Sequence, residues 1–305
     1  MHSASLYLAA VLIWGSTWFA IKFQLGVVAP EVSLLYRFAL ASAILLLFCL
    51  LTKRNLNFSA RQHVFIALQG LFLFSSNYLV FYWATGLLTS GIVALLFSTV
   101  ILMNIINATI FLRAPIRPQV VIGALIGIAG IAAIFWSEVS SVEQSSDSWR
   151  GLWLCLIATF FASMGNILSA RNQSNRLPVV QTNAWGMGYG ALIMLVYALF
   201  SGAEFTYENT PAYGLSLLYL SVFGSILAFG SYLTLIGRIG ADKTAYAAVL
   251  FPVIALGIST IFENYHWTLG AFGGFMLVLV GNFVVLRAKA KVYRPPETSI
   301  KDPVV

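Results

Sequence analysis

Two basic residues, Lys22 and Arg37, occur in stretches of the chain that are otherwise apolar. Lys22 closes the segment LIWGSTWFAIK, and Arg37 begins the segment RFALASAILL. A charge inside such a span costs roughly a few kcal/mol unless it is paired or hydrated, and two neighbouring cations repel each other. We predict that Lys22 and Arg37 form an outer basic gate that attracts the carboxylate of a solute. The alternative for Lys22 is that its long stem carries the ammonium to the membrane surface.

Three residues of the first apolar stretch share one face of a helix. Trp14, Trp18 and Lys22 follow one another at four-residue intervals, which places them on the same side. The face of a tryptophan ring can hold a cation, and a tryptophan at mid-span is less expected than one in an interfacial belt. Trp14 falls near mid-span, so we predict that it lines a path for solute.

Uncharged polar residues are dense in several of the other apolar stretches. Such groups often bond a neighbouring helix, but their density favours a solute path through the bundle. Pro252 removes one hydrogen bond from its helix; the break either opens the backbone beside a cavity or only kinks the helix. With Trp14 and Trp18, the candidate solute-lining residues are Asn77, Tyr78, Ser98, Asn104, Asn166, Tyr232, Tyr246 and Pro252.

The sequence contains no constellation typical of catalysis or of a metal site. The three histidines are scattered, and neither a metalloprotease HExxH, a GxSxG nor a P-loop occurs. No Asp or Glu lies in the middle of an apolar stretch, where proton-driven carriers commonly place their relay. We therefore expect no enzyme activity, no metal and no cofactor, and transport that does not depend on protons.

The elements that must position these residues are membrane-spanning helices. Of the 305 residues, 60% are hydrophobic and 9% are charged, whereas soluble domains carry about 25% charged residues. Helices of roughly 20 apolar residues cross a bilayer. The sequence predicts an all-α polytopic membrane protein with ten spans, at residues 6–23, 31–51, 64–84, 87–110, 119–136, 151–170, 179–200, 213–236, 241–262 and 268–287.

The basic residues indicate how these spans are oriented. If both termini are cytoplasmic, most of the 17 Lys and Arg residues fall in inner loops and in the tail, and most of the 10 acidic residues fall outside. This distribution explains the net charge of +7 without a nucleic-acid partner. The partners that we expect are the lipid bilayer and a small-molecule solute that carries a carboxylate; the sequence leaves a homodimer open.

The two halves of the chain repeat each other. When the sequence is shifted by 154 positions, Gly70 matches Gly224, Tyr78 matches Tyr232 and Phe97 matches Phe251. Each half has five spans, so the halves must insert in opposite orientations, as in many secondary transporters. The predicted units are a first repeat at 1–136, an external linker at 137–150, a second repeat at 151–287 and a cytoplasmic disordered tail at 288–305.

Several segments resemble the EamA-type branch of the drug/metabolite transporter superfamily. They are WGSTWFAIKF, RFALASAILL and YAAVLFPVIALGISTIFENYHWTLGAFGGFMLVLVGN. The resemblance implies ten helices in two inverted five-helix repeats, and a central cavity lined mainly by spans 1, 3, 4, 6, 8 and 9. It also implies export of amino acids or other small metabolites across a bacterial inner membrane. One departure is Ala114 in LRAPI, where many members carry an acidic residue.

Together these observations predict a multi-pass exporter of the bacterial inner membrane that works by alternating access. An uncharged, aromatic-rich path suits amphipathic solutes, and amino acids are the first expectation. The alternatives are a drug or nucleoside-like exporter and, from a different class, a membrane-embedded enzyme acting on lipid.

Overall fold

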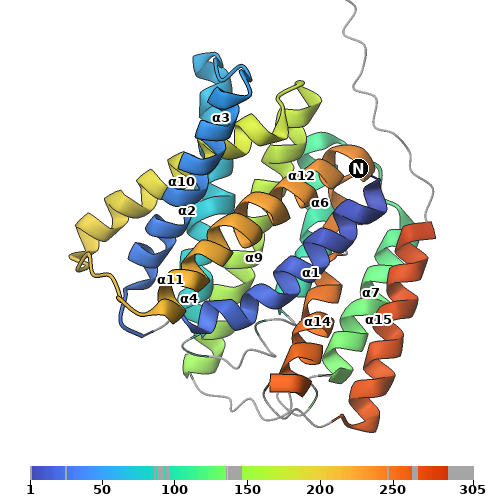
Figure 1. Ribbon diagram of the computed structural model, residues 1–305. Coiled ribbons are helices and arrows are strands. Elements are labelled where there is room, and N and C mark those ends of the chain that lie inside the picture. The colour runs from blue at the N-terminus through green and yellow to red at the C-terminus, as the bar shows by residue number, and fades with distance from the viewer. Residues whose placement is uncertain are drawn as a thin grey trace, which may run out of the picture.

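Every described element of the chain is a helix (Figure 1). The computed structural model describes residues 2–24, 26–85, 87, 93, 96–134, 136, 146–245, 247–262 and 267–287. The elements are α1 (Ser3–Lys22), α2 (Pro30–Leu51), α3 (Ala60–Leu71), η1 (Phe72–Ser76), α4 (Asn77–Thr85), α6 (Val100–Leu112), α7 (Pro118–Ile134), α9 (Ser146–Ser174), α10 (Val179–Ser201), α11 (Pro211–Tyr219), η2 (Leu220–Leu227), α12 (Ala228–Ile239), α13 (Ala241–Ala245), α14 (Ala247–Phe262) and α15 (Leu269–Arg287).

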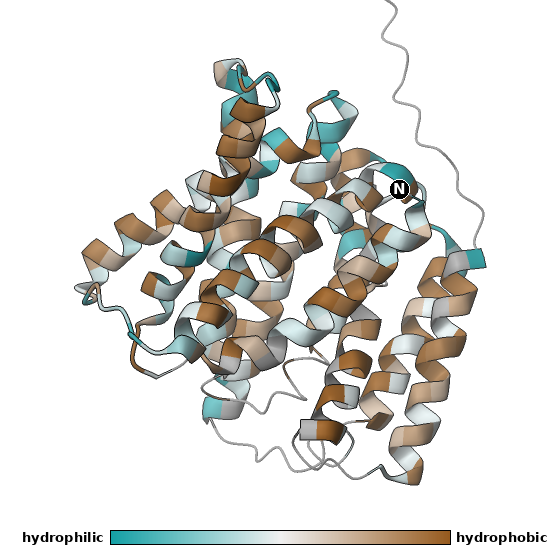
Figure 2. Ribbon diagram, viewed as in Figure 1, coloured by the Kyte–Doolittle hydropathy of each residue, from teal (hydrophilic) through white to brown (hydrophobic). Residues whose placement is uncertain are grey.

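These helices confirm the predicted all-helical membrane fold. Each of the ten predicted spans coincides wholly or partly with a described helix. Hydrophobic residues run along the helices, and hydrophilic ones gather at several helix ends (Figure 2). Outward-facing side chains such as Phe200 and Leu269 are 88% and 94% exposed, as expected for groups that meet lipid. Among the described residues, five stretches are by length and composition able to cross a membrane: Pro30–Leu51, Ala60–Ala84, Trp149–Ser174, Val179–Ser201 and Pro211–Ile239.

Two predicted boundaries differ from the structure. Residues 146–150, expected in the linker, form the first turn of α9, because the helix continues beyond its apolar part. The third span was expected to begin at 64 but begins at Ala60, where Ser59 and Gln62 form a reciprocal capping box. The turn predicted near Gly86 lies outside the described residues. Polar first turns therefore extend both helices beyond their hydrophobic limits.

The two halves of the chain pack against each other along most of their length. Helix α1 packs on α12 and α14, α2 on α10, and α7 on α15, so each of these helices from the first half has a partner in the second. In Figure 1, α1 and α9 run in opposite directions across the bundle. The central core is rich in aromatic residues: Phe38 and Phe74 are fully buried, with ring centroids 5.7 Å apart.

The third helix of each half contains a π-helical segment, which is uncommon and frequent at functional sites. In the first half η1 joins α3 to α4, and in the second half η2 joins α11 to α12. A serine in each segment donates a hydrogen bond to the carbonyl five residues earlier: Ser75 to Gly70 at 3.2 Å and Ser225 to Leu220 at 3.0 Å. The hydroxyls thus satisfy backbone oxygens that the widened turns loosen.

The helices α7 and α15 form a close pair at the side of the bundle (Figure 1). A Cβ added at Gly130 would lie 2.7 Å from the carbonyl oxygen of Gly274, and one added at Gly123 would lie 2.8 Å from that of Gly281. Only glycine fits at such distances, as in other close helix crossings within membranes.

Candidate solute-binding site

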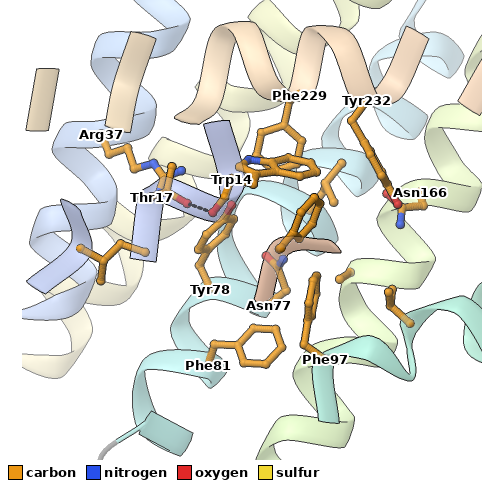
Figure 3. A pocket seen from close by; sticks show the side chains of 15 residues that line it. Trp14, Thr17, Arg37, Asn77, Tyr78, Phe81, Phe97, Asn166, Phe229 and Tyr232 are labelled. Atoms are coloured by element: carbon orange, nitrogen blue, oxygen red, sulfur yellow. Dashed lines mark hydrogen bonds between the residues drawn. The ribbon is translucent and has the colours of Figure 1, made fainter. Parts of the chain in front are cut away.

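A cavity of about 100 Å³ lies in the centre of the bundle, where helices of both halves meet (Figure 3). One buried water needs about 10–15 Å³, so the space suits a small solute. Its walls come from α1, α2, η1, α4, α6, α9, α12 and α14. The lining residues are Trp14, Thr17, Ile21, Arg37, Leu73, Asn77, Tyr78, Phe81, Phe97, Val100, Ala162, Asn166, Phe229, Tyr232 and Phe251.

Trp14 is the centre of the aromatic wall. Its ring lies 4.7 Å from Phe229, 4.9 Å from Tyr232 and 5.3 Å from Phe251, measured between ring centroids. Its indole Nε1 donates a hydrogen bond of 2.9 Å to the carbonyl oxygen of Gly224 in η2. The π segment therefore holds the ring in place, and the aromatic faces around it offer a surface on which an apolar or aromatic group can stack.

Arg37 brings a positive charge into this aromatic cavity. The residue is only 3% exposed, and its Nε donates to the Ser225 hydroxyl at 2.9 Å. Its guanidinium carbon lies 5.0 Å from the centroid of the Tyr78 ring, a cation–π arrangement. Its Nη1 has no hydrogen-bond partner, and among the described residues no carboxylate pairs with it. A buried charge without a counter-charge is costly, and a guanidinium in this position is chemically able to bind an anion.

Two asparagines place unpaired carbonyl oxygens at the same cavity. Asn77 and Asn166 are 5% and 3% exposed, and Oδ1 of each has no partner. The carboxamide of Asn166 lies beside the Tyr232 hydroxyl, as does that of Asn104. Figure 3 shows Asn77 pointing into the cavity between Tyr78 and Phe97. A buried carboxamide left without partners costs about 1–3 kcal/mol, which a hydrogen bond from a bound molecule would recover.

The structure brings six of the predicted site residues to the cavity and leaves two away from it. Ser98 and Asn104 are fully buried but do not line it, and Asn104 donates to the carbonyl of Ala241 at 3.3 Å. The side chains of Trp18, Lys22 and Pro252, and all of Tyr246, lie outside the described residues. Those at the cavity are Trp14, Arg37, Asn77, Tyr78, Asn166 and Tyr232.

Several lining residues were missed in the sequence, for a physical reason. Phe81, Phe229 and Leu73 are apolar side chains in apolar helices, where nothing in composition separates a cavity wall from a lipid-facing position. Two signals were available. Phe81 lies four residues after Asn77 and so shares its helix face, and Phe97 and Phe251, which match across the repeat, both line the cavity.

No group of three or more His, Cys, Asp or Glu residues gathers within the part of the chain that the structure describes. The groups at the cavity are aromatic rings, carboxamides, a phenol pair and a guanidinium. They can bind and orient a solute, but they make no acid–base pair of the kind that hydrolysis requires.

Comparison with known proteins supplies the family. The model of the EamA-like transporter family matches residues 2–136 and again residues 149–287. The chain belongs to this family. It is therefore a member of a transporter family, and the two matched segments correspond to the two halves that meet at the cavity.

The relatives in this family are similar over most of their length. Protein PagO of Salmonella typhimurium is 21% identical over 93% of this chain and 92% of its own. The uncharacterized inner membrane transporter YedA of Escherichia coli K12 is 29% identical over 83% of this chain and 80% of its own. A solved crystal structure with 17% identity superposes with a TM-score of 0.78, covering 94% of this chain and 98% of that one, which supports the fold.

Proposed function

We propose that this EamA-family protein exports small carboxylate-bearing metabolites, amino acids first among them, from the cell. The observation that carries the proposal is Arg37: a buried guanidinium with an unpaired Nη1, at the wall of a central cavity. The rest of the wall is mainly aromatic and aliphatic, which suits a solute with an apolar body and an acidic head. A carboxylate bound there supplies the counter-charge that the described residues do not.

Alternating access is the mechanism that fits a cavity between two repeats. The cavity takes Trp14, Arg37 and Tyr78 from the first half, and Phe229 and Tyr232 from the second. When two such halves rock against each other around a fixed site, the site faces one side of the membrane at a time. The family and the named relatives support a secondary transporter of the bacterial inner membrane.

Counterflow in proteoliposomes tests the proposed solute class. Purified protein is reconstituted, loaded with unlabelled solute and assayed for uptake of labelled amino acids, each compared with its decarboxylated amine. We expect uptake of apolar and aromatic amino acids and about a tenfold or greater preference over the amines, since hydrogen bonds to charged groups are worth about 1.5–3 kcal/mol. Uptake of nucleosides or cationic drugs in place of amino acids would contradict this proposal and favour the alternative, a drug or nucleoside-like exporter.

The proposed direction of transport requires a defined orientation. With both termini cytoplasmic, the segment 137–150 lies outside the cell, and Lys22 and Arg37 lie in the outer half of the protein. A cysteine-reactive, membrane-impermeant label directed at a tag in this segment should react in intact cells. Reaction only after permeabilisation would invert the proposed topology and place the guanidinium in the inner half.

A further inference from the structure

The carboxamide oxygen of Asn77 lacks a hydrogen-bond partner although the residue is buried at the cavity wall. Asn77 is only 5% exposed. It projects from the first turn of α4, directly after η1. Figure 3 places it between Tyr78 and Phe97, facing the open space.

Other buried acceptors of the protein are in different situations. Oδ1 of Asn104 and Oδ1 of Asn166 are also unpaired, but both carboxamides lie beside the Tyr232 hydroxyl, which can serve them after a small rotation. Ser221 and Gln181 have unpaired oxygens but do not line the cavity. Within the described part of the chain, Asn77 is thus the cavity-lining carboxamide with no local group to satisfy it.

We infer that Asn77 Oδ1 accepts a hydrogen bond from a donor on the solute while Arg37 holds the solute's acidic head. This inference rests on the proposed function and deepens it, because it requires two polar groups on the solute. One is an anion for the guanidinium, and the other is an N–H or O–H donor for the carboxamide. The donor is either the ammonium of an amino acid or a hydroxyl or ring N–H on its side chain.

The physical consequence is selectivity between solutes of nearly equal size. A solute that displaces water from Asn77 must replace the hydrogen bond of that water. An analogue without the donor leaves the carbonyl oxygen buried and unpaired, and sites built to bond a substrate hydroxyl or amine reject such analogues strongly. Simple apolar carboxylic acids are therefore poor solutes even though Arg37 attracts them.

Four matched solutes test this assignment: tyrosine, phenylalanine, 3-(4-hydroxyphenyl)propionate and 3-phenylpropionate. All four carry a carboxylate and one benzene ring, and they differ only in the amine and the hydroxyl. Binding is measured by thermal stabilisation of the detergent-solubilised protein, and transport by counterflow. We expect 3-phenylpropionate, which lacks both donors, to bind about tenfold or more weakly than the best donor-bearing solute. If affinity falls when the amine is absent, the ammonium is the donor. If affinity falls when the hydroxyl is absent, the donor is on the side chain.

Variants of Asn77 connect this preference to the residue. In Asn77→Leu, which has similar size but no polar atoms, the four affinities should agree to within about twofold. Asn77→Gln keeps the carboxamide and should retain the preference. Phe81→Leu, a change to an apolar wall residue one turn further along α4, should shift all four affinities together and leave their ratios unchanged.

The outcomes separate this inference from the function on which it rests. Equal affinity of all four solutes for the unmodified protein, or a preference that survives Asn77→Leu, overturns the role of Asn77 alone. If none of the four binds while a solute without a carboxylate does, both the proposed function and the inference are wrong.

Discussion

Gly70 in α3 and Gly224 in η2 occupy equivalent positions of the two repeats, but their surroundings differ. A Cβ added at Gly70 would collide with the backbone carbonyl of Gly186 in α10. A Cβ added at Gly224 would meet side chains instead, Thr17 at 3.1 Å and Arg37 at 3.3 Å. The first glycine thus permits two helices to pack, and the second makes room for residues that line the cavity.

Ser75 in η1 and Ser225 in η2 do not occupy equivalent positions of the repeats, and their contacts also differ. Ser75 donates to carbonyls of its own helix, at 3.2 Å to Gly70 and 2.8 Å to Leu71. Ser225 donates to Leu220 and also accepts the hydrogen bond from Arg37 Nε. A duplicated helix can thus keep its irregular backbone in both copies, while the serine of the second copy also orients Arg37 at the cavity wall.

The largest expected effect comes from removing Arg37, whose guanidinium is oriented by Ser225 of η2. Arg37→Met deletes the charge that we propose binds the carboxylate, so affinity for amino acids should fall by roughly 10- to 100-fold, as for other hydrogen bonds to charged groups. Uptake and protein level in the membrane are measured together. Arg54→Met, which alters an exposed arginine outside the cavity, serves as the matched control and should change neither. Normal uptake by a well-expressed Arg37→Met variant would show that Arg37 does not bind the solute.

The two glycines give opposite predictions for stability and for binding. Gly70→Ala should lower the free energy of unfolding by about 1–3 kcal/mol, because a backbone carbonyl cannot easily move away from the added methyl group. Gly224→Ala should affect stability less, because side chains can shift, but should weaken solute binding. Thermal unfolding and solute affinity are measured for both variants. Equal losses of stability would show that the two copies have the same structural task.

A smaller effect is expected at the contact between Trp14 and η2. Trp14→Phe keeps an aromatic ring but removes the donor to Gly224, leaving a carbonyl of the π segment unpaired at a cost of about 1 kcal/mol. Affinity should fall about fivefold, with the selectivity among solutes preserved. Trp153→Phe, on an exposed face of α9, is the control, and it should leave affinity unchanged.

The smallest effect distinguishes the two serines. Ser225→Ala should weaken amino-acid binding by a few-fold, because the Ser225 hydroxyl accepts the hydrogen bond from Arg37 Nε and its loss leaves the guanidinium freer to turn. Ser75→Ala should leave affinity within twofold and cost at most about 1 kcal/mol of stability. A change in affinity of the same size in both variants would contradict the division of tasks between η1 and η2.

The sequence predicted the features of this molecule that depend on long-range composition. Ten apolar stretches gave the helices, because lipid leaves few alternatives to a helix for each of them. Arg37 stood out because charged residues are rare in such stretches, and Asn77 because it belongs to a dense group of polar residues. The shift of 154 positions linked Tyr78 to Tyr232, and both lie at the cavity.

Other features depend on local geometry that composition does not encode. Each π segment is a local widening of the helix in which a serine hydroxyl bonds a backbone carbonyl. Serines are also common in ordinary helices, so the sequence did not reveal these segments. Asn104 was expected at the solute path but donates to Ala241 instead, because α13 brings that carbonyl toward it. The depth of Arg37 also required the structure, since its burial arises from Ser225 and Tyr78 on distant helices.

The close pairing of α7 with α15 has a consequence for biosynthesis. Helix α7 ends at Ile134 and α15 begins at Leu269, so their glycine-lined faces are made about 135 residues apart. At roughly 5–20 residues per second, synthesis of α15 begins about 7 to 27 seconds after synthesis of α7 ends. A chain whose synthesis stops before Leu269 therefore lacks the helix that packs on the glycine-lined face of α7.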